Sequence, residues 1–370
     1  MYRQQTPPLK ILEICPFSAG ICGVWTRVFA EAKELKKLGY SVYIFSSDKI
    51  RGTKERAEKE ECFGNIQITR FSAKPSFFSK NVNYFNFKKK FYELKPDIVI
   101  AHLLHPHSFL ALKLCLKNKI PCYLVTHAPF NVSRKFPLNL ITRLYSLIKI
   151  KRQIKKFTKI IAITKWEIPY LLKMGIKKEN LVYIPNSLVE AFFNQKKTKA
   201  KKDVLFLGRI APVKSLETLL YAAEKLPFIS FSLVGPSERT YLKKLDRIIK
   251  RLNLKNIKFF PPVYNIREKI KLIDNHKLFV LPSRREAMPQ VLLEAMSRGK
   301  IVISSKTDGG KEIIQEKKSG FLFEIGDSEK LSELIKKNIR GNARIEKNSG
   351  QEAKKYSWNK LIKLYPFIPK

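Results

Sequence analysis

Short apolar runs alternate with amphipathic stretches along the first half of the chain. Between the first two runs, residues 24–38 have helical periodicity and end at Gly39, a residue that favours the turn after a helix. Strands that alternate with helices form parallel sheets, because consecutive parallel strands need a crossover connection. The predicted strands are residues 9–15, 42–46, 66–71, 98–102, 123–126 and 159–163.

A polar, charged segment divides the chain, and the same alternation resumes after it. Residues 189–203 end in KKTKAKKD, which is typical of a linker. At 370 residues the chain is long enough for two domains with separate cores. We predict an α/β protein with domains at 1–190 and 191–356, and a segment 357–370 that packs back on the first domain or ends the second. The later strands are expected near residues 204–208, 229–234, 257–260, 278–281 and 301–304.

Ligands of parallel sheets bind beyond the carboxyl ends of the strands, so the loops after the strands are the candidate sites. The first such loop of the second half contains Gly208, Arg209 and Lys214. Gly208 lets a ligand approach the backbone, and the two cations can neutralise a diphosphate. Taken alone, they could equally be two of the 73 basic residues of the chain. Their position after a strand end favours a site.

The strand near residues 278–281 leads into a segment with two carboxylates. Glu286 lies on the predicted loop and Glu294 in the next helix, whose first turn tolerates Pro289. Free N–H groups at a helix start attract anions, and carboxylates accept hydrogen bonds from sugar hydroxyls. The segment therefore has the parts to hold a sugar linked to a phosphate. The alternative is an ordinary strand–helix unit with two solvated glutamates.

The pair Glu-x7-Glu, the string EAM at 294–296 and the string GGKEI at 309–313 resemble the retaining nucleotide-sugar glycosyltransferases of family 4. The Gly208–Arg209 and Lys214 loop resembles the same family's diphosphate motif, with Ser215 in place of its second glycine. The resemblance implies the GT-B fold, in which two Rossmann-like domains with parallel sheets face a central cleft.

The resemblance also implies roles for these residues. Glu294 would accept hydrogen bonds from the ribose of a nucleotide diphosphate sugar. Arg209 and Lys214 would stabilise charge on the leaving diphosphate. Glu286 and the N–H groups of Met288, Gln290 and Val291 would contact the sugar and the phosphates.

Two features of the first half belong to the same resemblance. His127 follows the strand 123–126 and resembles the family histidine that faces the donor sugar, although a packing histidine is the plainer alternative. Gly20 and Gly23 lie in the acceptor-side loop after the first strand, where they permit close backbone approach. The family usually has a Gly-Gly pair there, and GICG departs from it. How an acceptor meets this loop is therefore left open.

Other polar residues do not predict a metal or a cofactor. His102, His105 and His107 cluster without a specific zinc spacing or a nearby cysteine, so we interpret them as loop polarity or acceptor contacts. The chain has no Asp-x-Asp, the motif that holds a divalent metal in the other common sugar-transferase fold. We therefore expect no metal and no cofactor, with Arg209 and Lys214 supplying the positive charge.

Lysine and arginine outnumber aspartate and glutamate by 73 to 31, which gives a net charge of +42. Such a field attracts nucleic acid or an anionic membrane surface, but no zinc-finger or RNP-like motif supports nucleic acid as a partner. Residues 147–157 place Leu147, Ile150, Ile154 and Phe157 on one helical face, with lysines elsewhere. Such a helix docks on an anionic leaflet or packs in the core with its lysines solvated.

The cysteines are five, without metal-ligand or redox spacing, and no apolar run approaches the length of a membrane helix. We expect a cytoplasmic protein that is peripheral at the inner face of the membrane. The function predicted is transfer of a hexose-type sugar to a hydroxyl of a glycan or lipid-linked acceptor. The alternatives are a GT-B nucleotide-sugar epimerase and a non-enzymatic basic protein that binds membranes or nucleic acid.

Overall fold

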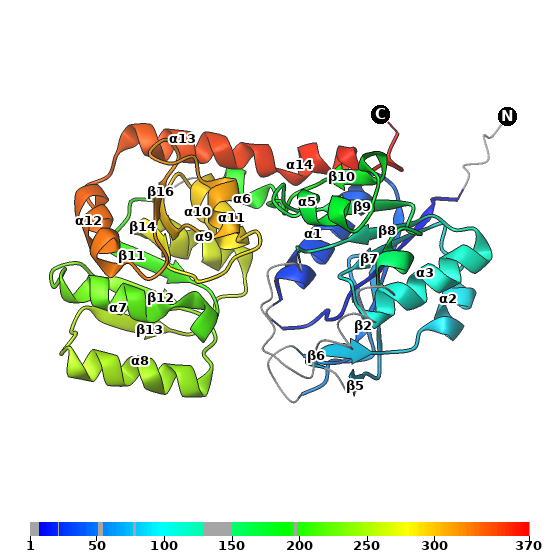
Figure 1. Ribbon diagram of the computed structural model, residues 1–370, viewed down its shortest axis with the longest axis horizontal. Coiled ribbons are helices and arrows are strands. Elements are labelled where there is room, and N and C mark those ends of the chain that lie inside the picture. The colour runs from blue at the N-terminus through cyan, green and yellow to red at the C-terminus, as the bar shows by residue number, and fades with distance from the viewer. Residues whose placement is uncertain are drawn as a thin grey trace. The chain divides into compact units, whose positions relative to one another are not determined.

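The chain divides into two compact units, each with a parallel sheet (Figure 1). The computed structural model describes residues 7–20, 22–50, 55–76, 79–128, 150–195 and 198–369. Unit 1 comprises Met1–Pro185 and Leu361–Lys370, and unit 2 comprises Asn186–Lys360. None of the helices in these ranges has the length and apolar character needed to cross a bilayer.

Unit 1 is built on an eight-stranded sheet in the order β10-β9-β8-β7-β1-β2-β4-β3. All neighbouring pairs are parallel except β3 with β4. A separate antiparallel pair is formed by β5 and β6. The strands are β1 Lys10–Ile14, β2 Ser41–Ser47, β3 Glu60–Phe63, β4 Ile66–Phe71, β5 Lys74–Ser76, β6 Ser79–Tyr84, β7 Ile98–His102, β8 Cys122–Val125, β9 Lys159–Ala162 and β10 Leu181–Tyr183.

Side chains on β1 alternate between the two faces of this sheet, as the pleat requires. Leu12 and Ile14 join the apolar core that also contains residues of α2 and α3. Glu13 lies on the opposite face, where α1 packs, and is fully buried. A charged residue in the middle of a central strand therefore needs partners inside the protein. In the described part of unit 1, the helices with both ends placed are α1 Gly23–Lys37, α2 Lys88–Leu94, α3 Pro106–Asn118, α5 Ile168–Lys173, and the short 3-10 helices η2 Lys178–Asn180 and η5 Ile362–Leu364.

Unit 2 has a six-stranded, fully parallel sheet in the order β13-β12-β11-β14-β15-β16. Its strands are β11 Lys202–Leu207, β12 Phe231–Val234, β13 Ile257–Phe260, β14 His276–Leu281, β15 Ile301–Ser305 and β16 Phe321–Phe323. Its helices are α6 Ala191–Asn194, η3 Pro212–Lys214, α7 Leu216–Glu224, α8 Arg239–Arg251, α9 Ile266–Asp274, α10 Gln290–Ser297, α11 Asp308–Ile313, α12 Ser328–Asn338, α13 Ala343–Ala353, η4 Lys354–Tyr356 and α14 Trp358–Leu361.

The strand order locates the point at which the chain changes direction in each sheet. In unit 2 the chain runs outward from β11 through β12 to β13, and then returns to β14 on the other side of β11. In unit 1 the corresponding point lies between β1 and β7. Loops diverge at such points and leave a crevice at the carboxyl ends of the strands. A ligand site is therefore expected at the loops after β11 and β14 in unit 2, and at the loops after β1 and β7 in unit 1.

The predicted fold class, α/β with two parallel-sheet domains, is confirmed. The compact units meet between Pro185 and Asn186, compared with the expected boundary after residue 190. The expectation of a linker throughout 189–203 is partly wrong. Residues 191–194 form α6, and Phe192 is buried. The Arg298 side chain holds this segment by donating to the Phe192 carbonyl at 3.0 Å.

Candidate active site

Lys214 and Glu286 meet at the switch point of unit 2. Lys214 ends the short helix η3 after β11, and its Nζ donates to Glu286 Oε1 at 2.5 Å. The Ser283 hydroxyl donates to the same oxygen at 2.5 Å. The Lys214 and Glu286 side chains are only 16% and 12% exposed, so the pair lies inside the loop cluster. The structure thus brings together two residues that the sequence motifs singled out separately.

Two glycines let the backbone segments around this pair approach closely. A Cβ on Gly235, the residue after β12, would lie 2.0 Å from the Gly208 carbonyl oxygen. A Cβ on Gly309 would lie 2.6 Å from the Ala287 carbonyl oxygen, and the Gly309 N–H donates to the Glu286 carbonyl at 3.0 Å. Any side chain at Gly309 would push α11 away from the loop that carries Glu286. This explains why the GGKEI string accompanies the Glu-x7-Glu pair.

Glu294 projects from α10 and is almost fully buried. Its Oε1 accepts a hydrogen bond from the Lys269 Nζ of α9 at 2.9 Å. Its other oxygen, Oε2, is buried and has no hydrogen-bond partner among the described residues. A buried carboxylate oxygen without a donor is costly unless a ligand completes it. Glu294 is therefore prepared to accept a hydrogen bond from a bound molecule.

Arg209 is placed differently from Lys214. Its side chain is 49% exposed, and its NH1 donates to Glu238 Oε1 at 3.1 Å. An exposed pair of this kind is worth little and breaks readily. Arg209 is therefore a half-exposed cation in the loop that begins with Gly208. The structure does not join Arg209 to the Lys214–Glu286 pair.

The loop before α10 is held by the start of unit 2. The Asn186 side chain donates to the Met288 carbonyl at 3.2 Å, and the Gln290 side chain donates to the Ser187 carbonyl at 3.2 Å. Pro289 is the N-cap of α10, so the helix begins at Gln290. The expectation that Pro289 lies in the first turn is wrong by one residue. The N–H groups of Gln290 and Val291 still belong to the open first turn of the helix.

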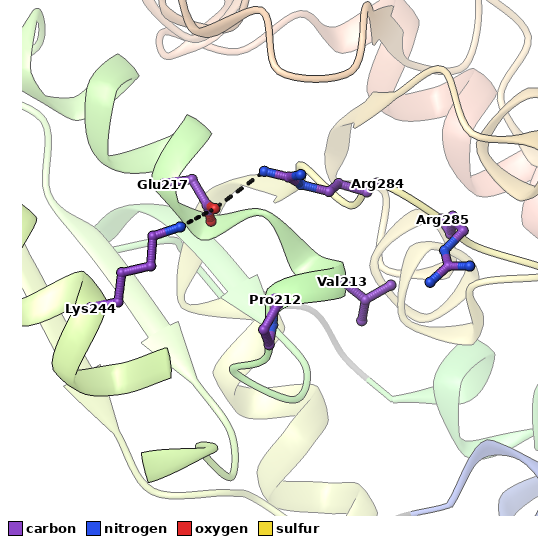
Figure 2. A pocket seen from close by; sticks show the side chains of 6 residues that line it. All are labelled: Pro212, Val213, Glu217, Lys244, Arg284 and Arg285. Atoms are coloured by element: carbon purple, nitrogen blue, oxygen red, sulfur yellow. Dashed lines mark hydrogen bonds and ion pairs between the residues drawn. The ribbon is translucent and has the colours of Figure 1, made fainter. Parts of the chain in front are cut away.

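A cavity of about 270 Å³ adjoins the same loops (Figure 2). Glu217 of α7 accepts from Lys244 at 3.0 Å and from Arg284 at 3.3 Å, as the dashed lines in Figure 2 show. The Arg284 N–H donates to the Val213 carbonyl at 2.9 Å, which ties the loop after β14 to the loop after β11. The cavity therefore has a cationic lining beside the two loops. Its lining residues are Pro212, Val213, Glu217, Lys244, Arg284 and Arg285.

In unit 1, the loop after β1, which is predicted from the sequence to lie on the acceptor side, is fixed by Arg70 of β4. Arg70 Nε donates to the Ser18 hydroxyl at 2.7 Å, and both residues are buried. Gly20 has a φ of 78°, which a residue with a side chain adopts at a cost. Gly23 begins α1 and has open space where a Cβ would project. Ile21, between them, lies outside the described residues. The loop is thus anchored at Ser18 and open near Gly23.

His127 belongs to a chain of three buried or half-buried side chains. Its Nε2 lies 3.0 Å from His102 Nδ1, and His102 Nε2 lies 3.1 Å from Glu13 Oε2. His102 is the last residue of β7 and is fully buried, and His107 is buried in α3. The interpretation of these two histidines as loop polarity or acceptor contacts is therefore wrong. Both ring nitrogens of His102 bond inside the protein, and His107 Nε2 donates to the His102 carbonyl at 2.9 Å, while His107 Nδ1 is buried with no partner among the described residues.

A second buried network lies beside Glu13 on α1. Arg27 donates to Glu31 at 3.2 Å and to the Ile184 carbonyl at 3.0 Å, and Tyr365 also donates to Glu31. The C-terminal residues of the chain are thereby fastened to the first helix of unit 1. Burial is the main cause that raises the pKa values of Glu13 and Glu31. Burial likewise lowers the pKa values of His102 and His127.

Glu13, Glu31 and His102 offer ligand atoms within 4.8 Å of one another, close enough to hold an ion. However, both oxygens of Glu31 already accept hydrogen bonds, one from Arg27 and one from Tyr365. A cation would have to displace a buried guanidinium to reach it. The arrangement fits a hydrogen-bonded network better than a metal centre.

The basic helix predicted at 147–157 is described from residue 150 onward. Residues 150–154 are helical, and both Ile154 and Phe157 belong to the unit 1 core. Of the two uses left open for the apolar face, core packing is the one observed for these residues. Lys151, Arg152, Lys155 and Lys156 are exposed. Leu147 and Lys149 lie outside the described residues.

Sequence reasoning missed Lys269, Glu13 and Arg27 as members of these clusters. Glu13 and Arg27 carried a signal, since each is a charge within an otherwise apolar strand or helix face. Lys269 carried none, because α9 contains several lysines and arginines with no distinguishing pattern. Its importance follows only from its contact with Glu294.

Two family models together cover residues 21–356. The model of the Glycosyltransferase Family 4 matches residues 21–189, and the model of Glycosyl transferases group 1 matches residues 189–356. The first includes His127, and the second includes Lys214, Glu286 and Glu294.

Individual proteins agree with these matches. An uncharacterized glycosyltransferase of Methanocaldococcus jannaschii is 25% identical over 365 residues, covering 96% of each chain. The N,N'-diacetylbacillosaminyl-diphospho-undecaprenol alpha-1,3-N-acetylgalactosaminyltransferase of Campylobacter jejuni is 24% identical and covers 91% of this chain and 98% of its own. The crystal structure of Anabaena HepE in complex with UDP-glucose has a TM-score of 0.72 at 18% identity, covering 96% and 97% of the two chains. That likeness extends over the whole fold.

Proposed function

The chain belongs to the family 4 glycosyltransferases of GT-B fold, and we propose that it moves a hexose-type sugar from a nucleotide diphosphate sugar to a hydroxyl of a lipid-linked acceptor. One observation carries the proposal. Lys214 and Glu286 form a largely buried ion pair, and Glu294, also in unit 2, has a buried oxygen with no hydrogen-bond partner among the described residues. A diphosphate would need a cation such as Lys214. A ribose hydroxyl would need a hydrogen-bond acceptor such as the Glu294 oxygen.

The donor would bind at the carboxyl ends of β11 and β14. The ribose would donate to Glu294 Oε2, which would remove the cost of that unpartnered oxygen. The diphosphate would draw Lys214 toward its own oxygens and leave Glu286 free to accept from the sugar. Arg209 would swing from Glu238 to the diphosphate, since an exposed ion pair is inexpensive to break. The N–H groups of Met288, Gln290 and Val291 would complete the anion site.

The transfer itself would proceed with retention of anomeric configuration. The acceptor hydroxyl would attack the anomeric carbon from the face on which the diphosphate leaves. The bond from the anomeric carbon to the diphosphate oxygen breaks, and a phosphate oxygen takes the hydroxyl proton. No protein carboxylate would act as a nucleophile, in contrast to retaining hydrolases. Lys214 and Arg209 would stabilise the negative charge that grows on the diphosphate, while His127 of unit 1 would face the donor sugar.

The name of one relative and the net charge of the chain support a lipid-linked acceptor. By its name, the Campylobacter jejuni relative acts on a sugar linked to diphospho-undecaprenol, a lipid. The net charge of +42 favours an anionic membrane surface, where such an acceptor would reside. Anabaena HepE binds UDP-glucose, which favours a uridine nucleotide among the donors to test.

A panel of nucleotide sugars tests this function. Purified protein is incubated with UDP-glucose, UDP-galactose, UDP-N-acetylglucosamine or GDP-mannose, with and without a membrane lipid extract. We expect release of the nucleoside diphosphate with one donor, increased by the extract, and an α-linked product by NMR if the donor is α-linked. An epimerase would instead interconvert the sugar without an acceptor. Absence of turnover with every donor would favour a non-enzymatic basic protein, and an inverted product would rule out retention.

A further inference from the structure

We infer that Glu13 and His102 are positioning residues that act through His127, holding its ring in the tautomer with a proton on Nδ1. The ring would then present a hydrogen-bond donor to the oxygen atoms of a bound sugar. The use of that donor rests on the proposed function, in which His127 faces the donor sugar. The tautomer itself does not depend on that function.

The sheet brings the three residues into line. β1 and β7 are neighbours in parallel register, with Glu13 opposite Ile100, so His102 lies just beyond Glu13 along the strands. The Glu13 and His102 side chains are fully buried. His102 Nε2 contacts Glu13 Oε2 at 3.1 Å, and His102 Nδ1 contacts His127 Nε2 at 3.0 Å. Both ring nitrogens of His102 are used, and one of His127. Nδ1 is therefore the nitrogen of His127 that remains for a ligand.

The proton on this chain can be arranged in only two ways while both rings are neutral. A neutral imidazole has one N–H, so each ring donates at one nitrogen and accepts at the other. If Glu13 is protonated, it donates to His102 Nε2, His102 Nδ1 donates to His127 Nε2, and His127 carries its proton on Nδ1. If Glu13 is ionised, every bond reverses, and His127 Nδ1 becomes an acceptor. The protonation of Glu13 thus decides what His127 offers at the site.

The surroundings of Glu13 favour the protonated form. Glu13 Oε1 is buried and has no hydrogen-bond partner among the described residues. A bare oxygen of this kind is costly on a carboxylate and tolerable on a neutral acid. Arg27 lowers the pKa of Glu13, but by less than either burial or the Glu31 charge raises it, and Arg27 forms an ion pair with Glu31. Burial and the Glu31 charge both raise the pKa of Glu13, while burial keeps His102 neutral by lowering its pKa.

Several described residues around Glu13 contribute to this balance. They are Cys15 directly after β1, Arg27 and Glu31 on α1, His102 on β7, His127 after β8, His107 on α3, and Tyr365 near the C-terminus. Arg27 is the one cation among these described groups, and Glu31 is its partner. None of the other groups named here is a cation that would stabilise an ionised Glu13.

The backbone at His127 also points to a constrained ring. His127 has a φ of 56° and Ala128 a φ of 48°, both in the left-handed region that costs non-glycine residues about 1 kcal/mol or more. Such strain persists only where the surroundings over-determine the conformation. The preceding residue, Thr126, is fixed by its hydroxyl, which donates to Glu167 at 2.7 Å. The His127 ring is therefore aimed by its backbone and bonded at one nitrogen.

Ring ¹⁵N NMR of the ligand-free protein reads the tautomers directly. The chain has five histidines, and two serve as internal references. His107 donates from Nε2 to the His102 carbonyl, and His276 donates from Nδ1 to the Leu272 carbonyl at 2.8 Å. His105→Asn and His127→Gln variants assign the remaining signals. We expect both His102 and His127 to be protonated on Nδ1 at pH 7. Protonation of His102 on Nε2 at pH 7 would overturn the inference.

Two substitutions at Glu13 separate the tautomer from packing. In Glu13→Gln the amide donates to His102 Nε2 as the protonated acid does, so the Nδ1 tautomers should remain and should no longer change at high pH. Glu13→Leu removes the donor, and His127 should lose its fixed tautomer. A Glu13→Gln variant with the Nε2 tautomer at His102 would contradict the proposal.

With the donor that turns over fastest in the panel, Glu13→Gln should keep kcat within about threefold. Glu13→Leu should lower kcat by about a hundredfold with little change in KM, the scale of one lost donor to a reacting group. Equal losses in the two variants, with unchanged melting temperatures, would refute the positioning role. If no donor turns over, the NMR result still decides the tautomer, so the two proposals fail separately.

Discussion

Lys214 and Glu286 lie 72 residues apart in the sequence, yet their side chains form a 2.5 Å ion pair at the switch point of unit 2. The pair unites the two loops that diverge from β11 and β14. Without a ligand, each charge satisfies the other in a site that is mostly closed to water. A diphosphate that entered would have to compete for Lys214, and its charge would then replace that of Glu286. The proposed donor site would therefore be charge-balanced before it is filled.

Replacement of either predicted diphosphate cation should slow transfer. We expect Lys214→Ala to lower kcat/KM by about a hundredfold or more, because a half-buried cation on a leaving group is hard to replace. Arg209→Ala should have a smaller effect, about tenfold, since its side chain is half-exposed and water can substitute in part. Initial rates of nucleoside diphosphate release measure both. Lys225→Ala, which removes an exposed ion pair of unit 2, is the control and should leave the rate unchanged. Near-normal rates in both site variants would place the diphosphate elsewhere.

Lys269 should matter for donor affinity although it touches no predicted ligand atom. Lys269→Met leaves the buried Glu294 carboxylate without its counter-charge and removes the bond that orients it. We expect the Kd of the donor to rise about tenfold, with kcat reduced less than threefold. Titration calorimetry measures this Kd, with the nucleoside diphosphate used in place of the donor to avoid turnover. Lys271→Met on the same helix is the matched control. An unchanged Kd in Lys269→Met would show that Glu294 does not bind the ribose.

The transfer should not depend on a divalent metal. In the proposed site Lys214 and Arg209 would supply the positive charge, and the chain lacks Asp-x-Asp. Activity should therefore persist in an excess of EDTA. A rate that vanishes with EDTA and returns with Mg²⁺ or Mn²⁺ would contradict this prediction.

The site was predictable where its chemistry is local in the sequence. Glu286 and Glu294 lie on one loop and the helix that follows it, so strand and helix periodicity sufficed to place them. Lys269 lies 25 residues before Glu294, and Glu13 lies 89 residues before His102. Such pairs arise from strand order and helix packing, which hydrophobic periodicity does not encode. The buried role of His102 was missed for that reason.

The fold was predictable for the central strands, which are largely apolar runs. β10 and β16 were missed because each has only three residues and becomes a strand through its parallel neighbour. Periodicity also cannot distinguish an apolar face that packs in a core from one that meets lipid. Ile154 and Phe157 are 0% and 4% exposed, so these two residues pack in the core. Only the folded structure could distinguish this packing from contact with lipid.

Glu167 should make the stability of unit 1 depend on pH. Burial is the main cause that raises its pKa to about 7, despite hydrogen bonds from Thr126, Ile163 and Thr164. The unfolded chain has the ordinary value near 4.5. A raised pKa in the folded state means that the protonated form stabilises the fold below pH 4.5, and that this contribution is lost as the pH rises to 7.

The Glu167→Gln variant removes this dependence. Whatever the substitution costs at pH 5, the variant should gain stability relative to the parent by up to about 3 kcal/mol between pH 5 and pH 8. Urea unfolding at the two pH values measures the difference. Glu179→Gln, an exposed glutamate, is the control and should follow the parent. Parallel pH dependence of parent and Glu167→Gln would mean that Glu167 is ionised throughout.

The exposed lysines after residue 150 should contribute to binding of an anionic membrane. Lys151, Arg152, Lys155 and Lys156 face solvent while Ile154 and Phe157 anchor the segment in the core. Each basic residue near an anionic surface is worth about 1 kcal/mol, and salt screens this attraction over about 10 Å at 0.1 M. The protein should therefore bind phosphatidylserine vesicles at low salt, release them as salt rises, and ignore phosphatidylcholine vesicles.

The position of the charges, and not their number alone, should decide the affinity. Replacing those four residues with glutamine should weaken vesicle binding by about tenfold or more without lowering the melting temperature, because none of the four is buried. The matched control replaces four exposed lysines of unit 2, Lys317, Lys318, Lys336 and Lys337, and removes the same net charge. If the two variants lose equal affinity, the net charge of +42 acts as a diffuse field and this segment is no docking surface. If the parent binds neutral and anionic vesicles alike, electrostatic docking is wrong, and the acceptor must be reached by another route.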